Sequence, residues 1–380
     1  MNKKIVVASD SFKGSLSSLQ VGEAAAKSIS SVLPEYHVEV VPVADGGEGT
    51  VEAIVSALKG KYVRVTVTGP LGNPVESVYG MCGSIAVIEM SAASGLTLVP
   101  PDKRNPWVMT SYGTGELIRD AVINGCRKFI IGIGGSATND GGIGMLQALG
   151  FRFFDAKGNT IGRGGSEAGR VAAIDTSCVL PELEKCSFRV ACDVTNPLTG
   201  NNGASYIFGP QKGADPEMIE KLDKGLESFS RVVADTCGED FSIYPGAGGA
   251  GGLGFAFLAF LGAKLESGIE MVLDTVSFDS KLERATLVIT GEGRLDYQTC
   301  MGKTPYGVLQ HAKRQGIPVI AIGGAVVPEA MESLMEAGFS SVFPIVSGPI
   351  SINEALKPEI ATFNVERTVA QILRTLFIRI

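Results

Sequence analysis

Charged side chains stand close behind several short apolar runs of this sequence, where the strands of a sheet would end. Four acids and two cations share this placement: Asp10, Asp45, Glu292, Asp296, Lys13 and Arg294. Mg²⁺ prefers carboxylate and phosphate oxygens, and bound phosphates in turn need cations or N–H donors. Because phosphoryl transfer depends mainly on positioning and charge stabilisation, the set predicts an enzyme that transfers a phosphoryl group. Asp10 and Asp45 are expected to line its substrate or phosphate site.

The other four residues receive separate roles in this interpretation. Glu292 and Asp296 are the predicted Mg²⁺ ligands, directly or through water. Lys13 and Arg294 are predicted to act in catalysis, facing the transferring phosphoryl group or a substrate carboxylate. The sequence leaves open that any one of the acids is only a helix cap.

Asp193 follows the apolar run at 188–192 and stands three residues before Asn196. We predict that Asp193 accepts the proton of the attacking hydroxyl group. Asn196 is predicted to contact substrate or phosphate. The pair Asn139-Asp140 is the alternative for that role.

Glycine is over-represented, with 49 of 380 residues against roughly 7% in an average protein. The turn at 134–138 and the run at 246–254 both precede helical patterns, and such turns offer N–H groups and a helix dipole to anions. The predicted phosphate- or substrate-binding residues of the first turn are Gly134, Gly135, Ser136, Thr138 and Asp140. The alternative is that both segments are tight turns and nothing more.

Two familiar nucleotide-binding patterns are incomplete or ambiguous here. The tripeptide at 302–304 resembles the end of a Walker A motif, but Tyr297 stands where the first glycine belongs. Residues 132–137 fit the G-x-G-x-x-A pattern of dinucleotide-binding folds, and 246–254 contains two similar matches. An NAD-dependent dehydrogenase of a small hydroxy acid is therefore an alternative, although Asp10 in the first turn would repel a pyrophosphate.

The composition excludes several functional classes. The chain has 33 basic and 40 acidic residues and a net charge of -7, without a basic run, so nucleic-acid binding is not expected. The apolar run at 5–8 is too short for a signal peptide, and no stretch is long enough to span a membrane, so we expect a cytoplasmic protein. Seven cysteines without a C-x-x-C spacing indicate reduced thiols, and with only two histidines a zinc site is improbable. Neither His37 nor His311 is expected to be catalytic.

Short apolar runs alternate with helical patterns at both ends of the chain. The N-terminal part predicts strands at 5–8 and 38–43 around a helix, with a capping box formed by Ser17 and Gln20. The C-terminal part predicts three more strands, at 286–290, 318–322 and 341–346, with helices at 307–314, 329–337 and 364–376. Five parallel strands with intervening helices indicate a doubly wound α/β sheet, most simply of the flavodoxin-like order 2-1-3-4-5.

The middle of the chain has a different pattern. Residues 62–68 alternate between apolar and polar, and further strands are predicted at 85–89, 129–133 and 188–192. The strand at 129–133 could instead belong to the outer sheet. We therefore predict a flavodoxin-like domain of residues 1–61 plus 283–380, interrupted by an inserted α/β domain of residues 62–282.

The motifs together resemble bacterial glycerate kinases, of the type distinct from the P-loop and ribokinase-like kinases. The matching segments run in order over nearly the whole chain: 9–16 (SDSFKGSL), 42–50 (PVADGGEGT), 89–96 (EMSAASGL), 110–117 (TSYGTGEL), 132–142 (GIGGSATNDGG), 190–198 (VACDVTNPL), 208–214 (FGPQKGA) and 288–296 (VITGEGRLD). That coverage is far more specific than any single motif.

The resemblance implies an ATP-dependent kinase of D-glycerate, which attacks through its 2-hydroxyl group; a 3-kinase is the alternative. It also implies a flavodoxin-like domain with an inserted domain similar to restriction-endonuclease folds. The expected partners are D-glycerate, ATP and Mg²⁺, in a monomer or a homodimer.

Overall fold

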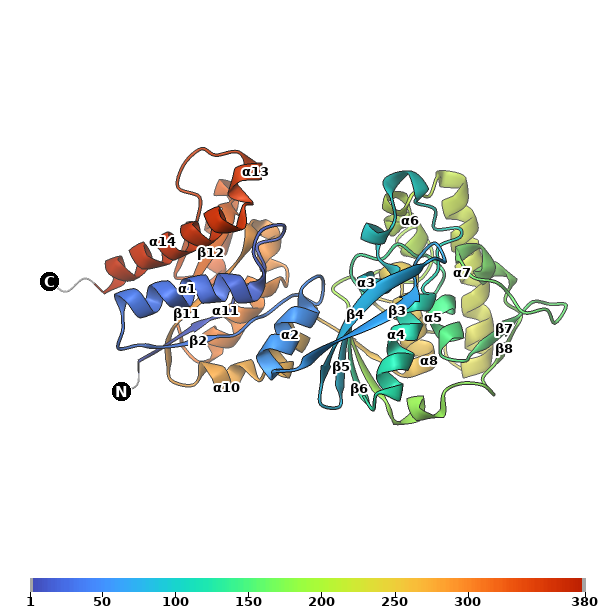
Figure 1. The fold of residues 1–380 in the computed structure, drawn as a ribbon. Coiled ribbons are helices and arrows are strands. Elements are labelled where there is room, and N and C mark those ends of the chain that lie inside the picture. The colour runs from blue at the N-terminus through green and yellow to red at the C-terminus, as the bar shows by residue number, and fades with distance from the viewer. Residues whose placement is uncertain (1–2, 378–380) are drawn as a thin grey trace. The chain divides into compact units, whose positions relative to one another are not determined.

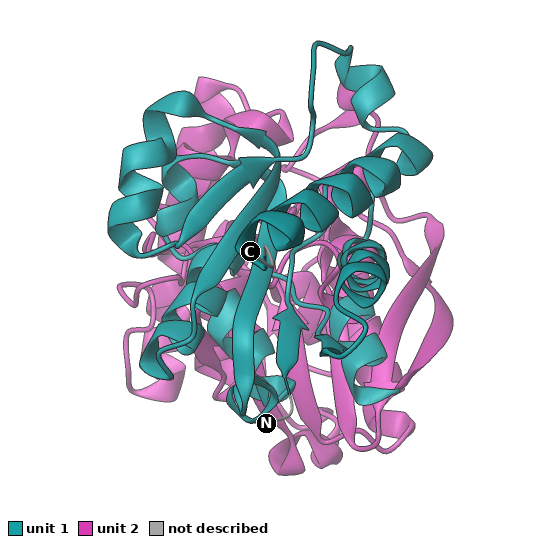
Figure 2. Ribbon diagram, turned by 90° about the vertical axis from the view of Figure 1, so that its left-hand side faces the viewer, with its two compact units in different colours: residues 1–45, 52–59, 269–380 teal, residues 46–51, 60–268 magenta. Residues whose placement is uncertain are grey.

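A computed structural model describes residues 3–377 and divides the chain into two compact units (Figure 2). The first unit comprises residues 1–45, 52–59 and 269–380, and the second comprises 46–51 and 60–268. The sequence analysis placed 269–282 in the inserted domain, whereas the structure groups this segment with the first unit. The reason is close packing, because a Cβ atom added to Gly307 would lie 2.5 Å from Cγ1 of Ile269.

The first unit is built on a sheet of five parallel strands in the order β2-β1-β11-β12-β13 (Figure 1). The strands are β1 (Lys4–Val7), β2 (His37–Val40), β11 (Ala285–Leu295), β12 (Val319–Val326) and β13 (Ser341–Pro344). In chain order within this sheet, the arrangement reads 2-1-3-4-5. The predicted flavodoxin-like topology is therefore confirmed.

Helices cover both faces of this sheet. They are α1 (Ser18–Val32), α2 (Thr50–Leu58), α9 (Gly268–Thr275), α10 (Phe278–Leu282), α11 (Thr304–Arg314), α12 (Met331–Ala337), α13 (Ile352–Ala355) and α14 (Pro358–Leu376). In α1 the predicted capping box of Ser17 and Gln20 is confirmed. Ile5 packs in one core with Val21 of α1 and Val369 of α14, and these two helices lie side by side (Figure 1).

The strands of the first sheet are apolar without alternation because both faces are covered. Successive side chains of a strand point to opposite faces. Ile5 and Val7 face the α1–α14 layer, and Val6 between them is just as deeply buried. The continuous apolar runs of the sequence are therefore the expected consequence of a sheet buried on both sides.

Strand β11 is longer than the sequence suggests. The sequence predicts a strand that ends at Thr290, but the strand continues to Leu295 beside β12. The two strands approach so closely that a Cβ atom on Gly291 would lie 2.3 Å from the Ile322 carbonyl oxygen. Glycine here serves close strand packing rather than a turn, and Glu292 lies within the strand instead of behind it.

The second unit contains a mixed sheet of six strands in the order β10-β9-β6-β5-β4-β3. The strands are β3 (Lys61–Thr68), β4 (Pro74–Cys82), β5 (Ile85–Glu89), β6 (Lys128–Gly132), β9 (Ser187–Ala191) and β10 (Lys264–Glu266). The four strands from β5 to β10 are parallel, while β3 and β4 are antiparallel to their neighbours. The predicted strand at 129–133 belongs to this sheet, as β6. A separate hairpin pairs β7 (Arg152–Phe154) with β8 (Ala173–Asp175).

Helices and aromatic rings close the core of the second unit. The helices are α3 (Ser91–Ser94), α4 (Tyr112–Ile123), α5 (Ile143–Ala148), α6 (Ala204–Phe208), α7 (Pro216–Cys237) and α8 (Leu253–Leu261). Phe229 of α7 meets Phe255 of α8 edge to face, with ring centroids 5.7 Å apart. Such aromatic pairs add to the free energy gained by burial alone.

Short 3₁₀ helices complete the connections in both units. They are η1 (Leu96–Leu98), η2 (Pro101–Lys103), η3 (Gly165–Arg170), η4 (Pro181–Lys185), η5 (Pro210–Lys212), η6 (Gly249–Gly251), η7 (Tyr297–Cys300) and η8 (Pro328–Ala330). Across residues 3–377, no helix combines the length and the apolar character that crossing a lipid bilayer requires.

Gly150, between α5 and β7, tests how closely backbone segments of the second unit pack. Its φ is +102°, and an added Cβ atom would lie 2.1 Å from the Cys178 carbonyl oxygen. Gly158 also has a positive φ, +79°, but open space around it. We expect Gly150→Ala to lower the free energy of unfolding by about 1–3 kcal/mol more than Gly158→Ala does, because only the former adds a clash to the backbone strain. Urea unfolding of both variants measures the difference, and equal losses would contradict it.

Candidate active site

Asp10 begins the turn behind β1 and is held by two hydrogen bonds. Its Oδ2 accepts a hydrogen bond from the Thr304 hydroxyl group at 2.7 Å, and its Oδ1 accepts one from the Ser11 amide at 2.6 Å. The amide of Asp10 itself donates to the Gly291 carbonyl oxygen of β11 at 2.8 Å. Since β1 and β11 are neighbours in the sheet, residues separated by most of the chain meet at one edge.

Glu292 projects from β11 at the same edge and is only 9% exposed. Its Oε1 accepts a hydrogen bond from the Thr299 hydroxyl group at 2.7 Å. The Lys303 ammonium group lies 3.7 Å from Oε2 of Glu292 and 3.9 Å from Oδ1 of Asp296. Lys303 thus lies close to both carboxylates that are predicted to bind the metal ion.

Burial and neighbouring carboxylates make the charged forms of Asp10 and Glu292 unfavourable. Burial and the charge of Asp45 raise the pKa of Asp10 to about 7, although the bonds from Thr304 and Ser11 oppose the shift. Burial also raises the pKa of Glu292, against the effects of Thr299 and Lys303. Carboxylates that destabilise one another in this way fit a site whose ligand brings positive charge.

Asp296 has a structural task of its own. Its Oδ1 accepts a hydrogen bond from the Gln298 amide at 2.9 Å, and its amide donates to the Thr299 hydroxyl group, which makes it the N-cap of η7. The alternative that one of the acids is a helix cap therefore applies to Asp296. Within residues 3–377, no cluster of three or more His, Cys, Asp or Glu side chains is arranged to hold a metal ion. Metal binding by Glu292 and Asp296 stays a prediction.

Lys303 and Thr304 are the residues of this site that the sequence analysis missed. They were set aside with the incomplete Walker A pattern, which lacks its first glycine at position 297. In the structure Lys303 is the N-cap of α11 and Thr304 its first residue. A lysine and a threonine at a helix N-terminus can meet an anion there, even though the preceding loop is not a Walker A loop.

The two predicted catalytic cations lie on the exposed side of the cluster. Arg294 is exposed, with its Nε 3.7 Å from Oδ2 of Asp296. Lys13 is also exposed, and its backbone lies beside β11, because a Cβ atom on Gly293 would be 3.4 Å from the Lys13 nitrogen. The structure therefore brings all six charged residues with which the sequence analysis began to one part of the first unit.

In the second unit, the turn behind β6 has an exposed and a buried half. Gly134 and Gly135 are exposed, and Gly135 has a φ of +73°. Within the described part of the chain, the backbone N–H groups of Gly134, Gly135 and Ser136 have no protein acceptor. Unpaired N–H groups in a glycine turn are the kind of donor that binds anions in proteins.

The buried half of the turn does not reach solvent. Thr138 and Asp140 have no exposed surface. The Asp140 carboxylate accepts hydrogen bonds from the amides of Gly142 and Gly144 and from both the amide and the hydroxyl group of Ser111. This corrects the prediction that Thr138 and Asp140 contact a ligand directly, because both support the turn from inside. Asp140 is also poorly placed as an alternative proton acceptor.

The glycine run at 246–254 serves backbone packing. A Cβ atom on Gly251 would lie 2.0 Å from the Thr138 carbonyl oxygen, and one on Gly252 would lie 2.7 Å from the Gly141 α-carbon. The Gly141 amide also donates to the Gly251 carbonyl oxygen at 3.0 Å. The tight-turn alternative therefore describes this segment, which holds the other glycine turn in place.

Asp193 and Asn196 lie behind β9 in the same unit. Asp193 is exposed, and its Oδ1 accepts a hydrogen bond from the Gly268 amide at 3.1 Å, which fixes the direction of the carboxylate. The Asn196 side-chain amide donates to the Asn202 carbonyl oxygen at 2.8 Å. Asp193 thus keeps an accessible carboxylate, whereas Asn196 shapes its loop.

Glu89 contributes to the second unit in a way that the sequence analysis did not assign. Its carboxylate accepts hydrogen bonds from the amides of Gly49, Thr50 and Val51, the last at 2.9 Å, at the start of α2. Burial nevertheless raises its pKa. The side chain at the end of β5 therefore fixes the turn at 46–51.

The two histidines, which the sequence predicts not to be catalytic, both lie in the first unit. His37 is exposed on β2. His311 is buried in α11, with Nδ1 2.7 Å from Oδ1 of Asp279 and Nε2 3.1 Å from Oε2 of Glu270. This side chain connects three helices of the first unit.

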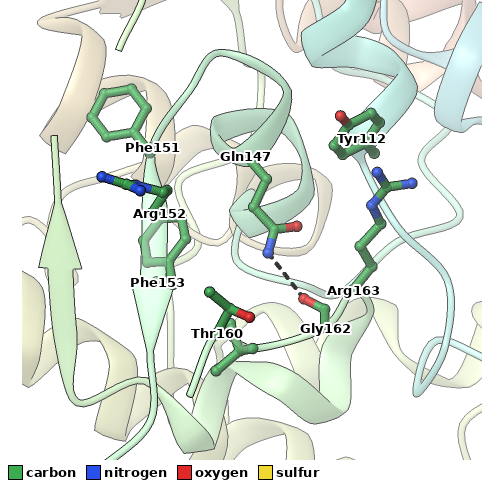
Figure 3. A pocket seen from close by; sticks show the side chains of 9 residues that line it. Tyr112, Gln147, Phe151, Arg152, Phe153, Thr160, Gly162 and Arg163 are labelled. Atoms are coloured by element: carbon green, nitrogen blue, oxygen red, sulfur yellow. Dashed lines mark hydrogen bonds between the residues drawn. The ribbon is translucent and has the colours of Figure 1, made fainter. Parts of the chain in front are cut away.

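A cavity of about 350 Å³ lies elsewhere in the second unit (Figure 3). Gln147 lines it and donates to the Gly162 carbonyl oxygen at 3.0 Å, and the Arg163 guanidinium lies 3.3 Å from the centroid of the Tyr112 ring. None of the predicted site residues lines this cavity.

Known proteins resemble this chain over almost its whole length. The profile of the glycerate kinase family matches residues 5–377. A glycerate kinase of Bacillus subtilis is 48% identical over 97% of this chain and 96% of its own. A glycerate 2-kinase of Escherichia coli is 49% identical over 93% of each chain. A crystal structure from Salmonella typhimurium LT2, of a protein assigned as glycerate kinase 2, superposes with a TM-score of 0.91 at 49% identity, covering 99% of this chain and 98% of that one.

The doubly wound sheet, the charged cluster at its edge and these matches define a phosphotransferase acting on an alcohol group. The chain belongs to the glycerate kinase family. The resemblance that the motifs carried is thereby confirmed.

The raised pKa of Asp10 predicts a pH dependence of stability. Because the folded-state pKa of about 7 lies above the unfolded value of 3.8, protonated Asp10 stabilises the fold below pH ~4, and this contribution is lost as the pH rises through 7. The free energy of unfolding of the wild type, relative to Asp10→Asn, should therefore fall from pH 4 to pH 7. Urea titrations without divalent cations measure it, with Asp235→Asn on exposed α7 as control. Parallel curves for wild type and Asp10→Asn would contradict the assignment.

Proposed function

We propose that this protein transfers the γ-phosphoryl group of ATP to the 2-hydroxyl group of D-glycerate, in the presence of Mg²⁺. The observation that carries the proposal is the cluster of Asp10, Glu292, Lys303 and Thr304 at the sheet edge where strand order reverses. Ligands of open α/β sheets bind at this edge. Membership of the glycerate kinase family supplies the substrate class.

Glu292 and Asp296 are the proposed ligands of the magnesium ion, directly or through water. Burial raises the pKa of Glu292, and the charges of Asp296 and Asp45 add to this shift. A divalent cation bound there would relieve this repulsion and neutralise charge on the phosphate oxygens. The Lys303 ammonium group, 3.7 Å from Oε2 of Glu292, adds a positive charge beside this carboxylate.

The N–H groups of Gly134, Gly135 and Ser136 are the proposed phosphate donors of the second unit. Three adjacent donors at the end of β6 can stabilise charge that develops on a phosphoryl group. Lys13 and Arg294 are exposed and therefore remain proposed contacts of the phosphoryl group or the substrate carboxylate.

Asp193 is the proposed acceptor of the hydroxyl proton. In the reaction the 2-hydroxyl oxygen bonds to the γ-phosphorus, the bond from that phosphorus to the β–γ bridging oxygen breaks, and ADP leaves. The proton of the hydroxyl group passes to the Asp193 carboxylate, which the Gly268 amide holds in one orientation. We further propose that the enzyme works in the cytoplasm, as a monomer or a homodimer.

Replacement of Asp193 tests this role. We expect Asp193→Asn to lower kcat by about 10² or more, because the amide cannot accept the proton, while the thermal midpoint stays within a degree or two of wild type. Steady-state kinetics at saturating MgATP and glycerate measure the effect, with Asp235→Asn as the matched exposed control. A kcat near that of wild type would remove Asp193 from the reaction.

An enolase-coupled assay tests the reaction itself. Purified protein, MgATP and D-glycerate are incubated with enolase in the absence of phosphoglycerate mutase. We expect phosphoenolpyruvate to form, because 2-phosphoglycerate is the product that enolase consumes, and chelation of Mg²⁺ should stop its formation. A signal that needs added mutase would indicate phosphorylation of the 3-hydroxyl group instead. No signal under either condition would exclude D-glycerate as the substrate.

A further inference from the structure

Lys212 is a fully buried lysine to which the proposed reaction assigns no role. It ends η5, in the segment 208–214 (FGPQKGA), and is only 1% exposed. Its ammonium group donates a hydrogen bond to the Thr138 carbonyl oxygen at 2.7 Å. Lysine is almost never fully buried unless it is paired, so the contacts of Lys212 indicate what this side chain does.

The electrostatic partner of Lys212 is Asp140, two residues behind Thr138. Burial lowers the pKa of Lys212 to about 7, and the attraction of Asp140 opposes that shift. Burial likewise raises the pKa of Asp140, whose carboxylate is stabilised by the hydrogen bonds from Ser111, Gly142 and Gly144. Lys212 therefore holds the turn at the Thr138 carbonyl oxygen, and Asp140 holds it through hydrogen bonds to its own carboxylate.

These contacts fix the inner half of the turn that carries the proposed phosphate donors. Its outer half, at Gly134 and Gly135, has no side chains with which to anchor itself and includes a left-handed residue. One side of the turn is held by backbone hydrogen bonds to the segment 94–96, from the Leu96 amide to the Gly135 carbonyl oxygen and from the Ala137 amide to the Ser94 carbonyl oxygen. Lys212 holds the next peptide group, because a donor to the Thr138 carbonyl oxygen limits rotation of that group and so restricts the turn beside it.

We propose that Lys212 is a positioning residue for nucleotide binding, which holds the turn at 134–138 in the shape that receives the phosphates of ATP. The inference deepens the proposed function and rests on its assignment of this turn to phosphate binding. Lys212 is itself too deeply buried to touch the nucleotide. Its effect is on the geometry of the three N–H groups.

Direct nucleotide binding tests this without relying on turnover. The probe is the non-hydrolysable ATP analogue AMPPNP with Mg²⁺, titrated by calorimetry into wild type and into Lys212→Met, which preserves side-chain length but removes the donor and the charge. We expect Kd to rise tenfold or more. Hydrogen–deuterium exchange of the Ala137 amide, which donates to the Ser94 carbonyl oxygen at 2.9 Å, should accelerate at least tenfold in the unliganded protein, because the turn loses the bond that holds Thr138.

A control separates positioning from a general loss of stability. Gly150→Ala destabilises the same unit through the clash with Cys178 and is not part of the proposed site. It should bind AMPPNP as wild type does at the same temperature, with unchanged exchange of the Ala137 amide. If Gly150→Ala weakened binding as much as Lys212→Met does, the effect of Lys212 would be only structural and the proposal would fail.

A second variant serves if Lys212→Met alone does not fold. Lys212→Met combined with Asp140→Asn removes both buried charges together, and it should fold but still bind AMPPNP tenfold or more weakly. Binding within twofold of wild type, with unchanged exchange of the Ala137 amide, would overturn the proposal. If the wild type bound AMPPNP but phosphorylated no glycerate, the proposed substrate would be wrong while the role of Lys212 remained.

Discussion

The adjacency of β1 and β11 is the constraint on which the rest of the site depends. Parallel pairing of these strands brings Asp10 and Glu292, which most of the chain separates, to one edge of a buried sheet. The charged form of each carboxylate is unfavourable there, since burial and neighbouring carboxylates raise the pKa of both. The sheet is apolar and covered on both faces, so its packing can offset the cost of the crowded charges at its edge.

The same edge explains why α11 begins where it does. A helix N-terminus carries positive partial charge, and α11 adds to it Lys303 and the hydroxyl group of Thr304. These groups lower the energy of Glu292 and Asp10 without fully compensating them. The proposed cation site lies at this edge, whereas the proposed phosphate donors Gly134 and Gly135 lie in the second unit. The proposed cation site and the proposed phosphate donors therefore belong to different sheets.

The sequence predicted the flavodoxin-like strand order well, because continuous apolar runs and the capping box of α1 are local signals. The predicted strand at 286–290 ended too early. Gly291 allows β11 to pass close to β12 and to continue to Leu295, so Glu292 lies within the strand. Lys303 and Thr304 were discarded because a motif was incomplete, although their chemistry needs only a helix N-terminus beside a carboxylate. No local pattern reports that β11 will lie next to β1.

Glycine in this chain is required mainly by contacts between backbones, and this weakens the dinucleotide-binding alternative. In the Rossmann pattern, glycines admit a pyrophosphate. Here a Cβ atom on Gly132 would lie 2.3 Å from the Gly46 carbonyl oxygen, and one on Gly251 would lie 2.0 Å from that of Thr138. Protein backbone fills the space that the cofactor would need at these two positions. Apart from the adjacent residues of the chain, no protein atom would lie closer than 3.7 Å to a Cβ atom added to Gly134. An anion can therefore approach the turn there. Lys212 and Asp140 hold the same turn from its buried side.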